Sequence, residues 1–174
     1  MTEINLTITN LKGLLDYDAR KFTSAEIQLK HSLHEWIRRA NSLKLKTALQ
    51  KYLDFAQEHV QKFEGFFEAE QISSLSSSNK VMKSFIEEAE EKMSICADPE
   101  VGDACLLASV QSINHFKISL YGTAAAFARE LNLEKFASVF HEAEINEKQI
   151  DDRLSRLAEH EINIRAKAPI VLLA

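Results

Sequence analysis

Residues 15–40 read LDYDARKFTSAEIQLKHSLHEWIRRA, and apolar side chains recur in this segment every three or four positions. That spacing places them on one face of an α-helix, as expected of a helix that packs into a core. At the centre of the face stands Glu26, where a leucine would be expected. Because a buried carboxylate without a partner is costly, we expect a metal ion, a cation or a proton to neutralise Glu26. The face comprises Leu15, Ala19, Phe22, Glu26, Leu29, Leu33, Ile37 and Ala40.

Four further segments show the same helical spacing, and an ionisable residue interrupts each of them near its middle: His59, Glu88, Lys117 and Glu147. With four glycines, two prolines and no sustained period-two alternation, the sequence predicts an all-α fold. A Ser-rich segment at 71–79 is the one longer connection, which favours a four-helix bundle with an additional shorter helix. The first predicted helix begins after Thr7 or Thr9 and ends near residue 40, and the others cover about 45–66, 80–96, 99–131 and 134–161.

The length and charge of the chain limit its class. Its 174 residues, 45% of them hydrophobic, suffice for one domain with a sizeable core, which we place at 1–165, before an apolar tail at 166–174. A net charge of -5 with scattered Lys and Arg argues against nucleic-acid binding. We find no secretory leader and no apolar run of the ~20 residues needed to cross a bilayer, and therefore expect a cytoplasmic protein.

Motifs for enzymatic chemistry are missing from the sequence. There is no Ser-His-Asp order, no Gly-rich phosphate loop and no zinc-type spacing, so hydrolase and kinase activities are not supported. Cys96 and Cys105 lack the CxxC spacing of metal sites. Because Cys105 stands among Ala104, Leu106 and Leu107, we expect it to be a small buried thiol.

The segment 101–123 resembles the YciE/YciF ferritin-like family. That family has an Asp-Ala-Ala start, a Gln, a Glu-His-Tyr-Glu-Ile motif and then Tyr-Gly-Thr, and this chain has Asp103–Ala104–Cys105, Gln111, Asn114–His115–Phe116–Lys117–Ile118 and Tyr121–Gly122–Thr123. Similar motifs elsewhere are Ser24–Ala25–Glu26 with Gln28–Leu29, Ile86–Glu87–Glu88 and Asn146–Glu147–Lys148. The resemblance implies a ferritin-like bundle in which Glu26, Glu88, His115 and Glu147 occupy positions in or beside a di-metal centre.

The chain departs from the family at four metal-side positions. Asn114 and Lys117 replace the two Glu residues of the Glu-His-Tyr-Glu motif. Tyr52 stands where the second helix usually has a His, and Asn146 where the last helix usually has a Glu. These substitutions remove negative charge and add an ammonium group where metal would sit, so a complete di-metal site is not expected.

The first hypothesis is a metal-free, non-enzymatic member of the family, with an interaction or stress-related role and without a cofactor. Lys117 then replaces the metal charge in a buried network with Glu26, Glu88 and Glu147. The competing interpretation is that Lys117 extends along the helix edge into solvent. We expect a homodimer, because helical bundles of this length often present a side face to a second copy.

The second hypothesis is an iron- or manganese-binding oxidoreductase with a reduced ligand set of Glu26, Glu88, His115 and Glu147. His59 and His115 are alternatively core or surface residues without a metal. A third hypothesis is a small-ligand pocket in the former metal centre, lined by Tyr52, His59, Asn114 and Phe116. The sequence leaves open whether Asn114 or His115 faces the interior, because neighbouring helix positions differ by about 100°.

Overall fold

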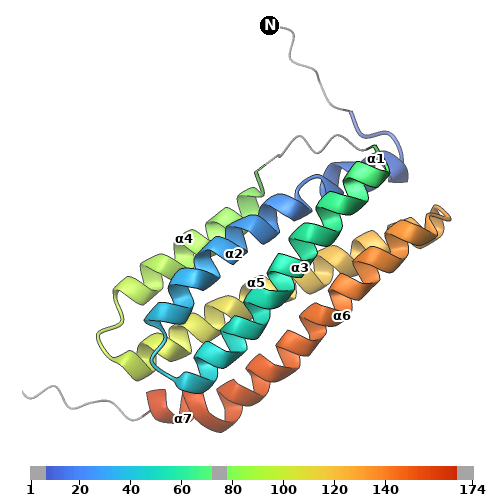
Figure 1. Ribbon diagram of the computed structural model, residues 1–174. Coiled ribbons are helices and arrows are strands. Elements are labelled where there is room, and N and C mark those ends of the chain that lie inside the picture. Colours follow the sequence, from blue (N-terminus) through green and yellow to red (C-terminus); the bar gives the residue numbers. More distant parts are fainter. Residues whose placement is uncertain (1–6, 72–77, 168–174) are drawn as a thin grey trace, which may run out of the picture.

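The computed structural model describes residues 7–71 and 78–167, and within these ranges it contains helices and no β-strand (Figure 1). The predicted all-α class is confirmed. The middle of the predicted longer connection, 72–77, and the tail from residue 168 lie outside the described residues. The helices are α1 (Leu11–Ala19), α2 (Phe22–Arg39), α3 (Leu43–Ala69), α4 (Lys80–Ser94), α5 (Pro99–Glu130), α6 (Glu134–Leu157), a π-helical segment η1 (Ala158–Ile162) and α7 (Asn163–Ala166).

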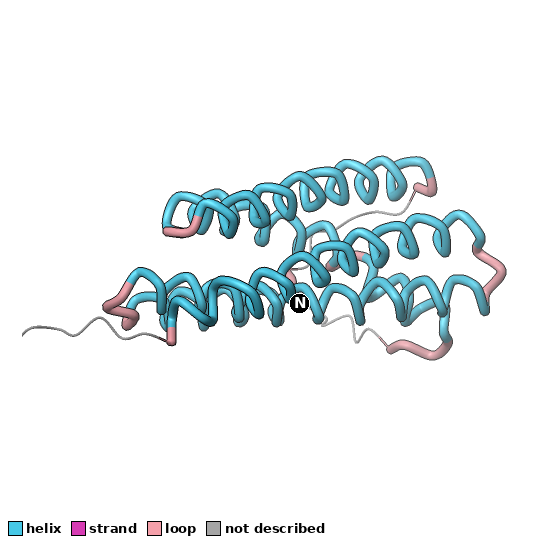
Figure 2. Tube along the Cα trace, turned by 90° about the horizontal axis from the view of Figure 1, so that it is seen from below, coloured by secondary structure: helices cyan, strands magenta, loops and turns pink. Residues whose placement is uncertain are grey.

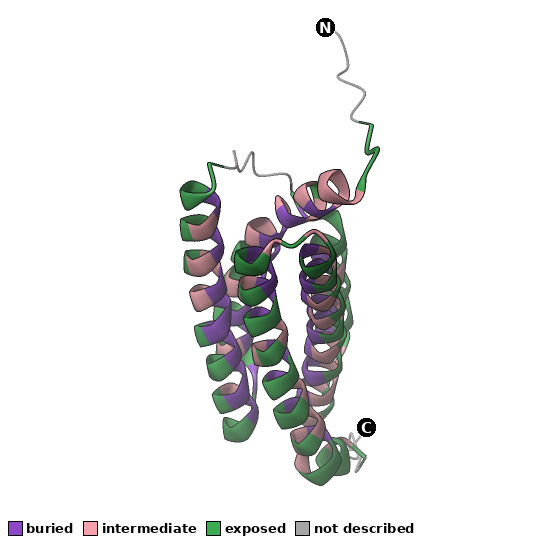
Figure 3. Ribbon diagram, turned by 90° about the vertical axis from the view of Figure 1, so that its right-hand side faces the viewer, coloured by how far each residue is buried: buried purple, intermediate pink, exposed green. Residues whose placement is uncertain are grey.

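Four long helices form the bundle. The pair α2 and α3 and the pair α5 and α6 each pack side by side, and α3 also contacts α6 (Figures 1 and 2). The shorter α4 lies along α5 and α2 on the outside of the bundle. The buried residues of each helix face its neighbours, while the outer faces are exposed (Figure 3). This arrangement agrees with the predicted four-helix bundle with an additional shorter helix.

The single first helix predicted from the sequence is wrong, because the structure divides it into α1 and α2 at Arg20 and Lys21. The backbone N–H groups of both residues bond to carbonyl groups of α1, and the chain turns before Phe22. The break lets α1 pack against α5, where Leu15 and Ala19 join a buried cluster. Burial of these apolar side chains favours the two-helix arrangement over a straight helix that would leave them less covered.

Helix ends follow the local signals in the sequence. Asp98 accepts hydrogen bonds from the N–H groups of Glu100 and Val101, and Pro99 occupies the first helical position of α5, as predicted. Asn132 has a φ of 57°, the left-handed conformation expected of it between α5 and α6.

The last predicted helix departs from regular α geometry at its end. Residues 158–162 adopt a π-helical turn instead. The wider turn leaves Ala158 and Ile162 buried against the core. It also leaves the Glu161 carboxylate in contact with the Lys44 ammonium group at the start of α3.

The buried apolar residues form two clusters. One is rich in aliphatic side chains and includes Leu29, Leu49 and Val110. The other is rich in aromatic side chains and includes Phe63 and Phe140. Four of the five positions predicted to interrupt the apolar faces lie between these two clusters, and Glu88 does not: Glu26, His59, Lys117 and Glu147. Cys105, predicted to be buried, is only half-buried at the edge of the first cluster.

Candidate functional site

Three charged side chains meet in the middle of the bundle. The ammonium group of Lys117 on α5 lies 2.9 Å from Oε2 of Glu26 on α2 and 2.6 Å from Oε1 of Glu147 on α6. At most 1% of any of these three side chains is exposed. The structure therefore brings together three of the four residues proposed as a buried network. It also excludes the interpretation in which Lys117 extends into solvent.

The second oxygen of Glu147 is held by neutral donors. The Tyr52 hydroxyl on α3 donates to Glu147 Oε2 at 2.7 Å, and Asn114 Nδ2 on α5 donates to the same oxygen at 2.8 Å. Asn114 Nδ2 also lies 2.9 Å from the Glu147 carbonyl oxygen. Asn114 is therefore the inward-facing member of the pair that the sequence left open.

The second oxygen of Glu26 is held in a similar way. His59 Nδ1 on α3 lies 3.0 Å from Glu26 Oε1, and the Tyr121 hydroxyl on α5 donates to the same oxygen. The other ring nitrogen of His59 lies 3.2 Å from the amide nitrogen of Asn146. The imidazole ring is stacked between Phe55 and Phe63. His59 is a buried, hydrogen-bonded core residue.

The charges in this cluster support one another. Burial by itself would raise the pKa of the Glu26 carboxyl, but the neighbouring Lys117 and His59 lower it from 4.5 to about 2. Burial by itself would lower the pKa of Lys117, but Glu147 and Glu26 outweigh it and raise that pKa above 10.5. Burial and the two carboxylates raise the pKa of Tyr52 and of Tyr121 well above 10.0, so both phenols stay protonated and act as donors.

Glu88 does not belong to this cluster, which corrects the prediction. Its side chain is 64% exposed and forms an ion pair with Lys92, one turn further along α4, at 2.6 Å. The reason is the rotation of α4: it buries the edge that carries Met82, Ala89 and Met93 and turns the Glu88 edge outward. The four-residue ligand set of the second hypothesis therefore loses Glu88.

His115 is also outside the cluster. Its side chain is 64% exposed, and its Nε2 lies 2.7 Å from Asp151 Oδ1 on the surface of α6. Because Asn114 faces the interior, the 100° step to the next helical position points His115 outward. The predicted metal set of Glu26, Glu88, His115 and Glu147 is therefore wrong as a set.

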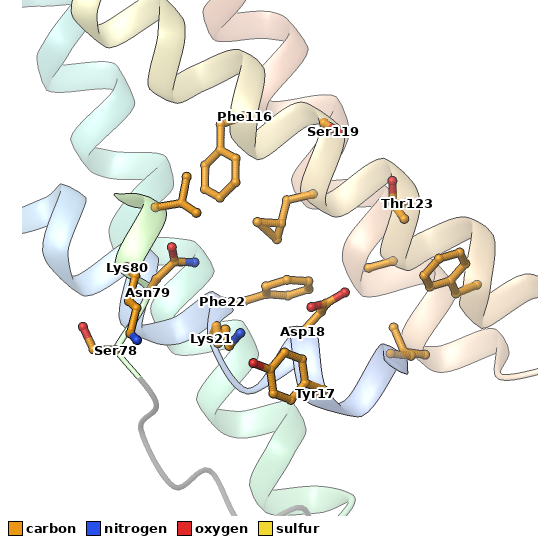
Figure 4. Close-up of a pocket in the computed structure, with 15 residues that line it drawn as sticks. Tyr17, Asp18, Lys21, Phe22, Ser78, Asn79, Lys80, Phe116, Ser119 and Thr123 are labelled. Carbon is orange, nitrogen blue, oxygen red and sulfur yellow. The ribbon is translucent and has the colours of Figure 1, made fainter. Parts of the chain in front are cut away.

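Phe116 corrects the predicted ligand pocket. Tyr52, His59 and Asn114 do surround the centre, but the Lys117 ammonium group lies among them, over the Tyr52 ring. Phe116 instead lines a separate cavity of about 520 Å³ between α5, the α1–α2 junction and the start of α4 (Figure 4). Phe22 and Thr123 line the same cavity. The four residues therefore do not line one pocket.

Sequence reasoning did not assign Tyr121 to the centre. A signal was available, because Tyr121 follows Lys117 by four residues and so lies on the same face of α5. The Tyr-Gly-Thr motif also contains this residue. The sequence identifies Asn146 as a replacement of a family Glu, but its place in the sequence does not predict its contact with His59.

The central residues do not fit a di-metal centre. Glu26, His59 and Glu147 place one ligand atom each within 4.8 Å of one another, as a metal site requires. All four carboxylate oxygens, however, already face a partner. The Lys117 ammonium group forms an ion pair with one oxygen of each Glu, whereas Tyr52 and Asn114 contact the other oxygen of Glu147, and His59 and Tyr121 the other oxygen of Glu26. A cation added here would meet the positive charge of Lys117 at the same oxygens.

Residues 10–167 match the protein family described as a domain of unknown function, DUF892. The chain belongs to the DUF892 family. Within known proteins, protein YciF of Escherichia coli K12 is 32% identical to it over 145 residues, which cover 83% of this chain and 87% of YciF.

Two solved structures resemble this DUF892 chain over most of its length. The crystal structure of the E. coli stress protein YciF superposes with a TM-score of 0.83 at 27% identity and covers 90% of this chain and 99% of YciF. A Rhodopseudomonas palustris protein, described as YcfI, a putative structural protein, has a TM-score of 0.82 at 24% identity and covers 89% of this chain and 98% of its own. The fold is that of a ferritin-like helical bundle, as the sequence resemblance implied.

Among the described residues, no helix combines the length and the apolar character that crossing a bilayer requires.

Proposed function

We propose that this DUF892 protein is a non-enzymatic ferritin-like bundle in which the Lys117 ammonium group takes the place of a metal ion. The observation that supports the proposal most directly is the position of Lys117 Nζ, 2.9 Å from Glu26 and 2.6 Å from Glu147. The ammonium provides the positive charge that two buried carboxylates need. Ion pairs then hold the interior of the bundle together without metal, and the role of this buried cluster is structural.

The biological context follows from the relatives. The E. coli relative is described as a stress protein. We therefore infer that this chain acts in a stress response, by interaction and not by catalysis. The cytoplasmic location and the homodimer expected from the sequence stay predictions. Light scattering coupled to size-exclusion chromatography measures the second of them.

Metal analysis tests the proposal. Protein is expressed in medium supplemented with iron and manganese, purified without chelators, and assayed for metal per chain. We expect far less than one ion per chain. Addition of Fe(II) under anaerobic conditions is expected to leave the melting temperature unchanged, because a ligand that does not bind the native state does not stabilise it.

One specific observation favours a second candidate function, a mononuclear metal site. The ligand atoms of Glu26, His59 and Glu147 are close enough to share one ion if Lys117 moves away. A stoichiometric ion that is lost in Glu26→Gln but retained in Glu88→Gln would contradict the metal-free proposal and support this alternative. Glu88→Gln is the matched control, because Glu88 is an exposed carboxylate on α4.

A further inference from the structure

The cavity that Phe116 lines is separate from the charged centre, and much of its lining is apolar. It measures about 520 Å³, a size typical of small-molecule sites, and lies between the α1–α2 junction, the start of α4 and the second half of α5 (Figure 4). Leu15 and Phe22 line it and are at most 1% exposed. Phe116, Leu120 and Phe127 on α5 also line it and are half-buried. An apolar group placed here is removed from water by three parts of the fold.

Asn79 supplies a buried hydrogen-bond donor at one side of the cavity. Its side chain precedes α4, lines the cavity and belongs to a residue that is only 4% exposed. Its Oδ1 accepts a hydrogen bond from the backbone N–H of Met82 at 2.9 Å, which identifies Nδ2 as the other end of the amide. Within residues 7–71 and 78–167, Nδ2 has no hydrogen-bond partner. Figure 4 shows this nitrogen on the side of the amide that faces the cavity.

Contacts with α2 fix the position of this donor. The backbone N–H of Asn79 donates to Ser24 Oγ at 3.3 Å, and the Asn79 carbonyl oxygen accepts from Gln28 Nε2 at 3.5 Å. Together with the hydrogen bond to Met82, these contacts hold the residue from both α2 and α4. The amide therefore loses little conformational freedom when a ligand binds, which favours affinity.

Two ammonium groups lie on the same side of the cavity as Asn79. Lys21 and Lys80 both line the cavity, and Figure 4 shows them with Asn79, across the cavity from Ser119 and Thr123. The start of α4 lies on this side as well, and the N-terminus of a helix carries a partial positive charge. A negatively charged group is therefore favoured beside Asn79.

One carboxylate opposes this positive charge. Asp18 lines the cavity, and burial raises the pKa of its carboxyl while the nearby Lys21 lowers it. In the described lining, two lysines and this single acid leave one net positive charge. Lys21 Nζ lies 3.7 Å from the centroid of the Tyr17 ring, and neither Lys21 nor Lys80 forms an ion pair with a described residue. Both ammonium groups are therefore available to a monoanion.

We propose that this cavity binds a small carboxylic acid with an apolar body, of the chemical class of a medium-chain fatty acid. The carboxylate accepts a hydrogen bond from Asn79 Nδ2 and is attracted by the ammonium groups of Lys21 and Lys80. The apolar body lies against Phe22 and Phe116. The proposal goes beyond the structural role of the Lys117 centre and does not depend on it, so metal analysis of the centre and ligand binding in the cavity can fail separately.

Titration of the full chain with decanoate tests the proposal, followed by nitrogen–proton correlation NMR. We expect the side-chain amide signals of Asn79 to shift and to saturate at one ligand per chain. Decanol has the same apolar chain without the charge, and decylammonium carries the opposite charge. Because both lack the group that Asn79 and the two lysines recognise, we expect each to bind about tenfold more weakly, or less than that.

The variant Asn79→Asp removes the donor and keeps the helix cap, because Asp caps a helix as well as Asn does. We expect decanoate to bind it about tenfold more weakly or not at all. Asn10→Asp is the matched control: Asn10 caps α1 by accepting from the Gly13 N–H and does not line the cavity, so this variant should bind as the wild type does. Lys80→Gln changes an exposed side chain and should weaken binding less, since solvent screens its charge.

Four results would overturn the proposal. Equal binding of decanol and decanoate would make the cavity a purely apolar site, and tighter binding of decylammonium would assign the recognition to Asp18. Shifts that do not saturate would indicate adventitious binding only. Wild-type affinity of Asn79→Asp for decanoate would show that the buried amide does not contact the ligand.

Discussion

Two ion pairs in this molecule have the same length and opposite surroundings. Lys117 lies 2.6 Å from Glu147 in the bundle centre, and Lys92 lies 2.6 Å from Glu88 on the outer face of α4. In the first pair the side chains are at most 1% exposed, and in the second they are 56% and 64% exposed. The distance between the charged atoms is therefore a poor guide to how much an ion pair contributes to stability, whereas the burial of its side chains is a good guide.

The physical difference is the solvent. Around Lys92 and Glu88, water and salt screen the charges, and each partner is solvated well enough when the other is removed. In the centre, removing one charged partner leaves the other charge buried, with neither a counter-charge nor water to solvate it. In the centre, each of the three charged groups therefore depends on the other two for its stability in the folded protein. The outer pair is a local surface contact.

The largest effect is expected from Lys117→Met. This substitution leaves Glu26 and Glu147 buried without a cation, and we expect the free energy of unfolding in urea to fall by about 3–5 kcal/mol. The matched control is Lys92→Met, which should unfold at the same urea concentration as the wild type. Equal midpoints for the two variants would contradict the distinction between the pairs.

The next largest difference between the buried centre and the surface pair is expected in how acid changes the free energy of unfolding. The pKa of Glu26 is about 2 in the folded protein against an ordinary 4.5, so its contribution to stability is present above pH 4.5 and is lost as pH falls toward 2. The difference corresponds to about 3 kcal/mol. The pKa of Lys117 is raised, so its contribution is present below pH 10.5 and is lost as pH rises through the folded value.

The measurement is urea unfolding between pH 2 and 7, for the wild type and for Glu26→Gln. We expect the acid-dependent loss to be smaller in the variant, since the amide does not titrate. Glu88→Gln should follow the wild-type curve. If Glu26→Gln did so as well, the assignment of acid sensitivity to the centre would be wrong.

A smaller effect is expected from Tyr52→Phe. The variant keeps the ring but removes the hydroxyl that donates to Glu147 Oε2, a hydrogen bond to a charged group worth about 1.5–3 kcal/mol. Thermal unfolding should show a lower melting temperature. Tyr17→Phe is the matched control, because Tyr17 is an exposed tyrosine of α1. No change in Tyr52→Phe would mean that Asn114 and Lys117 alone suffice to hold Glu147.

The smallest effect is expected from His115→Ala. Its contact with Asp151 lies on the surface, so the melting temperature should not change measurably. His59→Ala, which removes a buried ring from the centre, is the comparison and should lower the melting temperature clearly. The reverse order would restore His115 as a residue of the centre.

The sequence allowed part of the centre to be predicted because its spacing is unambiguous. In α2, α5 and α6, apolar residues stand one turn before and one turn after Glu26, Lys117 and Glu147, so these positions had to face the core. The helix ends near Asp98 and Asn132 followed from capping and left-handed preferences. These features depend on local spacing and local chemistry.

The errors arose where the neighbours of a helix decide its rotation. On α4, apolar residues lie on both edges, with Phe85 beside Glu88 and Ala89 on the adjacent edge, so the pattern alone did not fix which edge is buried. On α5, both Asn114 and His115 were plausible inward residues until packing chose one of them. The break at Arg20 and Lys21 had no Gly or Pro to signal it, because it results from contacts of α1 with α5.

The polar layer between the aliphatic and aromatic clusters has a consequence for the alignment of the helices. Ile113 and Tyr121 stand one turn before and one turn after Lys117 on α5. If α5 slid by one turn, either an isoleucine or a phenol would face Glu26 and Glu147, and the ammonium group would enter one of the apolar clusters. Purely apolar faces tolerate such a shift far better, because one aliphatic side chain can replace another. We therefore expect the three charges to fix the axial register of the helices and to exclude misaligned packings of the bundle.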